Sequence, residues 1–161
     1  MADLLTHYVS ARVVGLGLRV RATAMVFTLG AFLPDLLGKP LGHLPGIPDL
    51  AEVPTHSLLG LLFACGAACF LFAPDFRRRA FLALYAGSLV HILGDVLKTY
   101  LGRGSVVLLH PFSLRSFEVG LYRSEDVFYL LPANLGILAI LWIVGLRRGR
   151  TPGPSGDMSK A

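Results

Sequence analysis

The chain has 161 residues, of which 54% are hydrophobic and 16% are charged, and its mean hydropathy is +0.65. An average soluble domain contains roughly 25% charged residues, so this composition argues against an ordinary soluble protein and predicts one membrane-embedded domain. The formal net charge is +5, but the arginines lie in short clusters beside apolar runs rather than in a basic stripe. We therefore expect no nucleic-acid partner.

The apolar runs predict five helices. The first two are short and resemble a half-length hairpin that either spans the membrane or re-enters it, whereas the last three are about long enough to span it. A segment rich in glycine and proline, residues 39–54, predicts a loop. We expect an all-α, polytopic bundle of four or five helices over residues 1–148 and a disordered tail over residues 149–161. The five runs are residues 4–18, 22–33, 56–73, 80–100 and 126–146.

The positions of the arginines predict the orientation of the bundle. Arginine clusters follow the first, third and fifth runs, so all three fall on one side of an up-down bundle, which the positive-inside rule makes cytoplasmic. The acids and histidines then lie at the opposite end. This topology predicts an inner-membrane protein whose polar site faces the periplasm or the exterior. The clusters are Arg19 and Arg21, residues 77–79, and Arg147, Arg148 and Arg150.

The strongest candidate pair is His91 and Asp95. Residues four apart share one face of a helix, so imidazole and carboxylate can reach the same metal ion. The structural alternative is a histidine–aspartate hydrogen bond that ties two helices together. Ionisable groups inside membrane segments are energetically expensive and usually functional, but the pair alone does not decide between the two interpretations.

Three further residues complete the candidate site: His7, Asp35 and His56. Each has a structural alternative, because Asp35 can end a helix in a turn, and His7 can lie on an interfacial helix. His56 can sit in the first turn of a helix capped by Thr55. Together at one end of the bundle, they favour a shared site instead.

Three histidines and two aspartates suit zinc, or another divalent metal such as manganese, with one or two ions bound. Metal sites of this kind activate water and polarise phosphoryl oxygens, so hydrolysis is the simplest chemistry they support. His110, in a loop on the same side, is a candidate proton donor or ligand. Asp126, at the start of the last helix, is a candidate for proton transfer or a first-turn acid.

The order of the motifs resembles that of the YdjM-like inner-membrane metal-dependent hydrolases of bacteria and archaea. The resemblance covers roughly residues 3–146 and rests on Thr6-His7, residues 30–35 (GAFLPD), Thr55-His56-Ser57 and residues 87–95 (GSLVHILGD). It implies that the metal ligands are His7, Asp35, His56, His91 and Asp95.

This ligand order is in turn similar to that of zinc-dependent phospholipase C and the related single-strand nucleases. Those secreted enzymes use an N-terminal tryptophan and a further His-x-x-x-Glu motif, neither of which occurs here. The departure argues for one or two ions rather than a three-metal cluster.

The expected function is therefore metal-dependent hydrolysis of a phosphoester in a lipid or lipid-linked substrate at the outer membrane–water boundary. His110 or Asp126 would assist proton transfer. One alternative is a non-enzymatic, metal-stabilised scaffold with a closed ligand set. A metal transporter would need ionisable groups along the whole membrane depth, and the cytoplasmic halves of the last three helices have no acid or histidine. A third alternative is a lipid-binding module that uses the basic outer loop alone.

Overall fold

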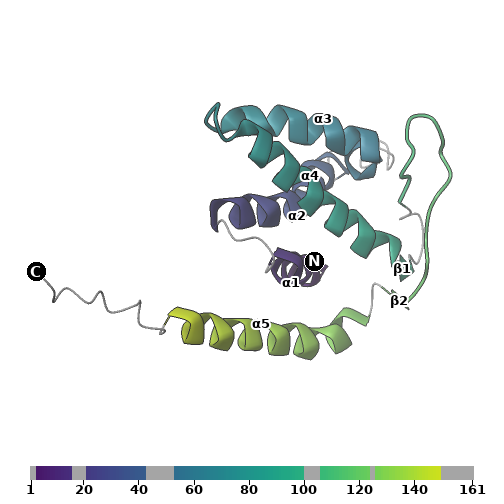
Figure 1. Ribbon diagram of the computed structural model, residues 1–161. Helices are drawn as coiled ribbons and strands as arrows, with labels where there is room; N and C mark the ends of the chain where they lie inside the picture. The colour runs from purple at the N-terminus through teal and green to yellow at the C-terminus, as the bar shows by residue number, and fades with distance from the viewer. Residues whose placement is uncertain (1–2, 16–20, 43–52, 100–105, 124–125, 150–161) are drawn as a thin grey trace, which may run out of the picture.

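The computed structural model describes residues 3–15, 21–42, 53–99, 106–123 and 126–149, and it confirms the all-α prediction (Figure 1). Two very short strands, β1 and β2, pair in parallel after the fourth helix. Apart from Gly149, the expected tail lies outside the described residues. The elements in chain order are α1 Asp3–Gly15, α2 Arg21–Gly42, η2 Pro54–His56, α3 Leu58–Ala68, η3 Cys69–Leu71, α4 Arg77–Val96, β1 Lys98–Thr99, β2 Tyr122–Arg123 and α5 Val127–Gly149.

Helices α2 and α4 form the centre of the molecule and cross at close range. Glycines make the approach possible, because a Cβ on Gly30 would lie 2.2 Å from the Leu84 carbonyl oxygen, and one on Gly87 would lie 2.0 Å from the Phe27 carbonyl oxygen. Helix α3 packs against α4, and α1 packs against both α2 and α4 (Figure 1). Buried apolar side chains from α1, α2, α3 and α4 fill the core around this crossing.

Helix α2 does not end at Leu33, as the Pro34-Asp35 pair predicted, but continues to Gly42. A proline inside a helix removes the N–H that would bond the carbonyl four residues earlier. Here that carbonyl belongs to Gly30, and the Ser88 hydroxyl of α4 donates to it at 2.8 Å. A side chain from the neighbouring helix thus satisfies the carbonyl that Pro34 leaves without its helical partner. The continuation also means that residues 39–42 are helical rather than part of the predicted loop.

The structure does not support the prediction of three membrane-spanning helices. Among the described residues, one helix is long and apolar enough to cross a membrane, Arg77–Val96. The span predicted over residues 56–73 is shorter because α3 gives way to the 3-10 turn η3 at Cys69. The arginines of residues 77–79 begin α4 instead of lying in the turn before it. The other apolar helical stretches are Leu58–Leu71 and Tyr129–Val144.

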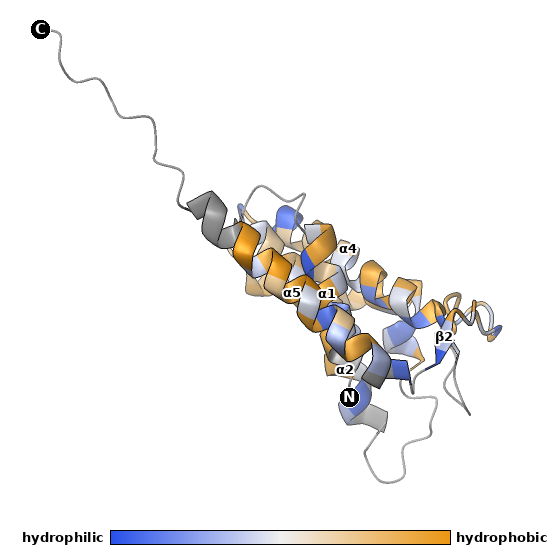
Figure 2. Cartoon of the chain, turned by 90° about the horizontal axis from the view of Figure 1, so that it is seen from below, coloured by the Kyte–Doolittle hydropathy of each residue, from blue (hydrophilic) through white to orange (hydrophobic). Residues whose placement is uncertain are grey.

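Helix α5 packs against α1 and carries a hydrophobic exterior (Figures 1 and 2). Tyr129, Ile140 and Trp142 are more than half exposed. At the buried side of α5, Asn134 donates to the Thr6 hydroxyl of α1 at 2.9 Å. The exposed apolar surface fits a membrane environment. The Asn134–Thr6 hydrogen bond holds α1 in place directly before His7.

Backbone hydrogen bonds hold the segment after α4 against the end of that helix. Val119 N–H donates to the Val96 carbonyl and Leu121 N–H donates to the Leu97 carbonyl, each at 2.8 Å. The Tyr122 hydroxyl donates to the Gly94 carbonyl at 3.2 Å. These bonds fix the C-terminal end of α4, where the candidate site lies.

Candidate metal centre

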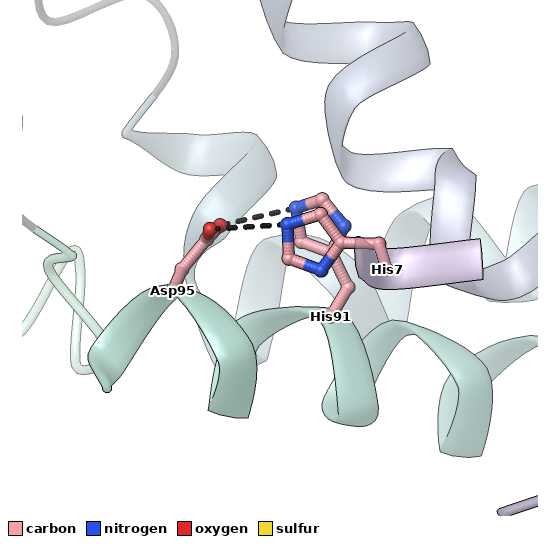
Figure 3. A group of neighbouring side chains, drawn as sticks. All are labelled: His7, His91 and Asp95. Atoms are coloured by element: carbon pink, nitrogen blue, oxygen red, sulfur yellow. Dashed lines mark ion pairs between the residues drawn. The ribbon is translucent and has the colours of Figure 1, made fainter. Parts of the chain in front are cut away.

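The structure brings all five predicted ligands together from four elements. Ligand atoms of His7, His91 and Asp95 lie within 4.8 Å of one another, and those of Asp35, His56 and His91 form a second such group that shares His91. Figure 3 shows the rings of His7 and His91 stacked beside the Asp95 carboxylate, and their centroids are 3.9 Å apart. The predicted convergence at one end of the bundle is therefore present in the fold.

The three histidines all direct Nε2 toward the two carboxylates. His91 Nε2 lies 3.0 Å from Asp95 Oδ2 and 3.8 Å from Asp35 Oδ1. His7 Nε2 lies 3.4 Å from Asp95 Oδ1, and His56 Nε2 lies 3.6 Å from Asp35 Oδ1. The His7, His91 and Asp95 residues are at most 5% exposed. The cluster is thus a compact, largely buried set of nitrogen and oxygen donors.

The protonation of His91 follows from its neighbours. Its Nδ1 lies 2.8 Å from the Ala31 carbonyl oxygen, and because a carbonyl only accepts, Nδ1 must carry the proton. Metal-binding histidines are commonly oriented by such a bond to a backbone carbonyl. His91 Nε2 is buried and has no hydrogen-bond partner among the described residues. In the neutral ring, its lone pair therefore faces carboxylate oxygens.

The N-cap of α3 fixes the position of His56, but the capping residue is not the predicted Thr55. Ser57, rather than Thr55, is the N-cap of α3, since its hydroxyl oxygen accepts from Gly60 N–H at 3.1 Å. Pro54 opens the 3-10 turn η2 before it, so His56 precedes α3 instead of lying in its first turn. Thr55 Oγ1 lies 3.0 Å from His56 Nδ1, which leaves Nε2 for the cluster.

Two lysines complete the cluster, and the sequence interpretation did not assign them to it. Lys39 contacts Asp35 Oδ2, and Lys98 contacts Asp95 Oδ1. Lys98 is 3% exposed. Their spacings of four and three residues from the aspartates are those of helical ion pairs, so this signal was readable in the sequence. The two ammonium groups match the charge of the two carboxylates.

Burial and these contacts shift the pKa values of Asp35 and Lys98. Burial alone would raise the pKa of Asp35, but the contacts with His56 and Lys39 outweigh it and lower the pKa from 3.8 to about 2. Because this folded-state pKa is depressed, Asp35 stabilises the fold above about pH 4 and loses that contribution as the pH falls toward 2. Burial lowers the pKa of Lys98 to about 8.

The structure does not bring His110 or Asp126 into the cluster. Neither belongs to a group of candidate ligands among the described residues. His110 is half-buried in the segment after β1, where its N–H donates to the Val107 carbonyl at 3.4 Å. The carboxylate of Asp126 accepts from Arg123 N–H at 2.9 Å, just before α5. The sequence predicts His110 and Asp126 at the same end of the bundle as the candidate ligands, and that criterion does not establish contact with the cluster.

Gly94 lies directly beneath His7, so Gly94→Ala is expected to weaken metal binding while preserving the fold. An added Cβ would lie 3.1 Å from His7 Cε1 and 3.2 Å from His7 Nδ1, which forces the ring to shift. We expect a roughly tenfold lower zinc affinity, at the low end of the effect of losing a supporting contact to a ligand. Competition with a chromophoric chelator measures it. Gly136→Ala is the control, because a Cβ there has no neighbour within 4 Å, and an equal effect of both substitutions would refute the placement of His7.

The fold and the cluster define a class: an all-α protein with a buried histidine–aspartate centre and a membrane-compatible exterior. The chain belongs to the YdjM inner membrane protein family, whose sequence model matches residues 1–152. This places the protein in the inner membrane. Searches of curated proteins and of solved structures return no significant match.

Proposed function

We propose that the protein is a divalent-metal-dependent hydrolase of the inner membrane that cleaves a phosphoester of a lipid or lipid-linked substrate. The metal ligands are His7, Asp35, His56, His91 and Asp95, with zinc as the best match to this donor set. A bound divalent ion would supply polarisation of a phosphoryl oxygen and activation of water. The residues would hold that ion at the outer membrane–water boundary, where a lipid headgroup lies.

The observation that carries the proposal is the orphaned Nε2 of His91. With Nδ1 committed to the Ala31 carbonyl, a neutral His91 ring presents its Nε2 lone pair to Asp95 Oδ2 at 3.0 Å. Two acceptors at that distance repel each other unless a cation or a second ring proton lies near them, and without a metal the Lys98 ammonium at Asp95 Oδ1 is such a cation nearby. A metal ion satisfies this nitrogen and the carboxylates together, and the other two histidines already direct Nε2 to the same region.

The same geometry limits His91 to one ion. The two groups of candidate ligands share His91, and its Nδ1 is occupied by the Ala31 carbonyl. One imidazole nitrogen has one lone pair, so His91 can serve a single metal ion. A second ion would have to bind Asp35 and His56 without His91.

The second candidate function is a non-enzymatic scaffold in which the metal is structural. The burial of the cluster favours it, because His7 and His91 are at most 2% exposed, and structural zinc sites are closed by protein ligands. A hydrolase needs one coordination position that a substrate can reach. The two candidates therefore differ in turnover, and both require metal binding.

The test is phosphoester turnover by the purified protein in mixed micelles. Zinc-loaded wild type would be incubated with a panel of phospholipids and lipid phosphates, before and after chelation, beside His91→Ala. The hydrolase proposal predicts release of phosphate or a phosphorylated headgroup by the loaded wild type, loss of that activity on chelation, and at least about a hundredfold lower rate in the variant. Stoichiometric metal without turnover of any substrate would favour the scaffold.

His110→Ala and Asp126→Asn are matched controls for the metal site. They remove a histidine and a carboxylate that lie outside the cluster, so both variants should retain metal. Their turnover tests the proton-transfer roles predicted from the sequence, independently of metal binding.

A further inference from the structure

Lys98 directs its ammonium group at the atoms that the metal would use. Its Nζ contacts Asp95 Oδ1 and lies 3.4 Å from His7 Nε2. These two residues, with His91, form one of the two groups of candidate ligands. Lys98 is 3% exposed, so its ammonium group belongs to the buried cluster and is not a surface charge.

The backbone of Lys98 is fixed, whereas its side chain can move. Lys98 pairs with Tyr122 in the β1–β2 ladder, and the preceding carbonyl of Leu97 accepts from Leu121 N–H. A lysine side chain has four rotatable carbons beyond this anchored position. Rotation of this side chain can move the ammonium away from Asp95 while the β1 backbone stays in place.

Charge makes such a movement necessary when a divalent ion binds. The two aspartates are matched by Lys39 and Lys98, so with neutral histidines the cluster is formally uncharged. Adding a divalent cation would place two net positive charges in a buried site, which is strongly unfavourable. Moving the Lys98 ammonium away from Asp95 weakens its repulsion with the ion and frees the Oδ1 lone pairs for the metal.

We propose that Lys98 is the internal cation of the metal-free site and that metal binding displaces it from Asp95 and His7. The lysine stabilises the cluster when the metal is absent and competes with the metal for the same ligand atoms. Once displaced, its ammonium remains tethered beside the centre, where it suits an anionic group such as a phosphoester. This inference rests on the proposed metal site.

The first test compares the zinc affinity of wild type, Lys98→Met and Arg123→Gln by chelator competition. Removing a buried charge-assisted contact that competes with zinc should raise the affinity of Lys98→Met by at least about tenfold. Arg123 is exposed and lies in the strand beside Lys98, so Arg123→Gln controls for the general loss of one positive charge and should change the affinity little. An equal or weaker affinity of Lys98→Met would overturn the inference while leaving the metal site intact.

The second test uses the wild type and does not depend on the folding of a variant. Reductive methylation of lysines, followed by mass spectrometry, would be measured with and without saturating zinc. The inference predicts that zinc increases the labelling of Lys98, with the other lysines as internal references. Unchanged or reduced labelling of Lys98 in zinc-bound protein would overturn it. If neither wild type nor Lys98→Met binds zinc, the proposed function itself fails, and this inference fails with it.

Discussion

Replacing Asp95 with asparagine is expected to abolish high-affinity metal binding and to destabilise the metal-free protein. Asp95 contacts His7, His91 and Lys98 through its two carboxylate oxygens, so the substitution removes a candidate ligand and the negative charge at those contacts. Loss of residues that merely support ligands costs about 10–100-fold in metal affinity, and we expect the loss of a ligand to exceed about 100-fold.

The stability effect of Asp95→Asn has a separate cause. Removing one partner of a buried ion pair typically costs about 3–5 kcal/mol, and Asp95 and Lys98 are 5% and 3% exposed. Thermal unfolding in detergent, with and without zinc, measures both effects, and Asp126→Asn is the matched control. A variant with wild-type stability and wild-type zinc affinity would contradict the geometry of the cluster.

The second large effect is expected at the crossing of α2 and α4. Gly87→Ala adds a Cβ that would lie 2.0 Å from the Phe27 carbonyl oxygen and 2.9 Å from Ala31 N. The helices must separate, which weakens the buried contacts between them and shifts the Ala31 carbonyl that orients His91. Overpacking of a well-packed core costs about 1–3 kcal/mol, and because this contact is backbone against backbone we expect the upper end.

Gly66→Ala is the control for that prediction. Gly66 lies within α3, and a Cβ there meets no atom within 4 Å. Alanine is favoured over glycine inside a helix by about 1 kcal/mol, so this variant should unfold at the same temperature as wild type or higher. If Gly87→Ala were equally stable, the close approach of the two helices would be wrong.

The clustering of five side chains could be predicted from the sequence because few acids and histidines interrupt its apolar runs. His91 and Asp95 share a helix face by spacing alone, and the topology placed His7, Asp35 and His56 at the same end. The structure brings these five side chains together. Their role as metal ligands, and the direction in which the site faces, remain predictions.

The features that the sequence did not predict depend on contacts between distant residues. Helix α2 continues through Pro34 because Ser88, on another helix, bonds the Gly30 carbonyl, and no local pattern contains that contact. The sequence predicted Thr55 as the N-cap of α3, and the 3-10 turn that begins at Pro54 makes Ser57 the cap instead. Hydropathy alone overestimated the length of the helix predicted over residues 56–73, because α3 ends at Ala68.

Elemental analysis of the detergent-purified protein tests the central claim most directly, with wild type measured beside the double variant His91→Ala/Asp95→Ala. The proposal predicts one or two zinc or comparable divalent ions per chain in the wild type, and background metal in the variant. A folded wild type that contains no metal, even after reloading with zinc and manganese, would contradict the account. The histidines and aspartates would then be a buried hydrogen-bonded network that joins α1, α2 and α4.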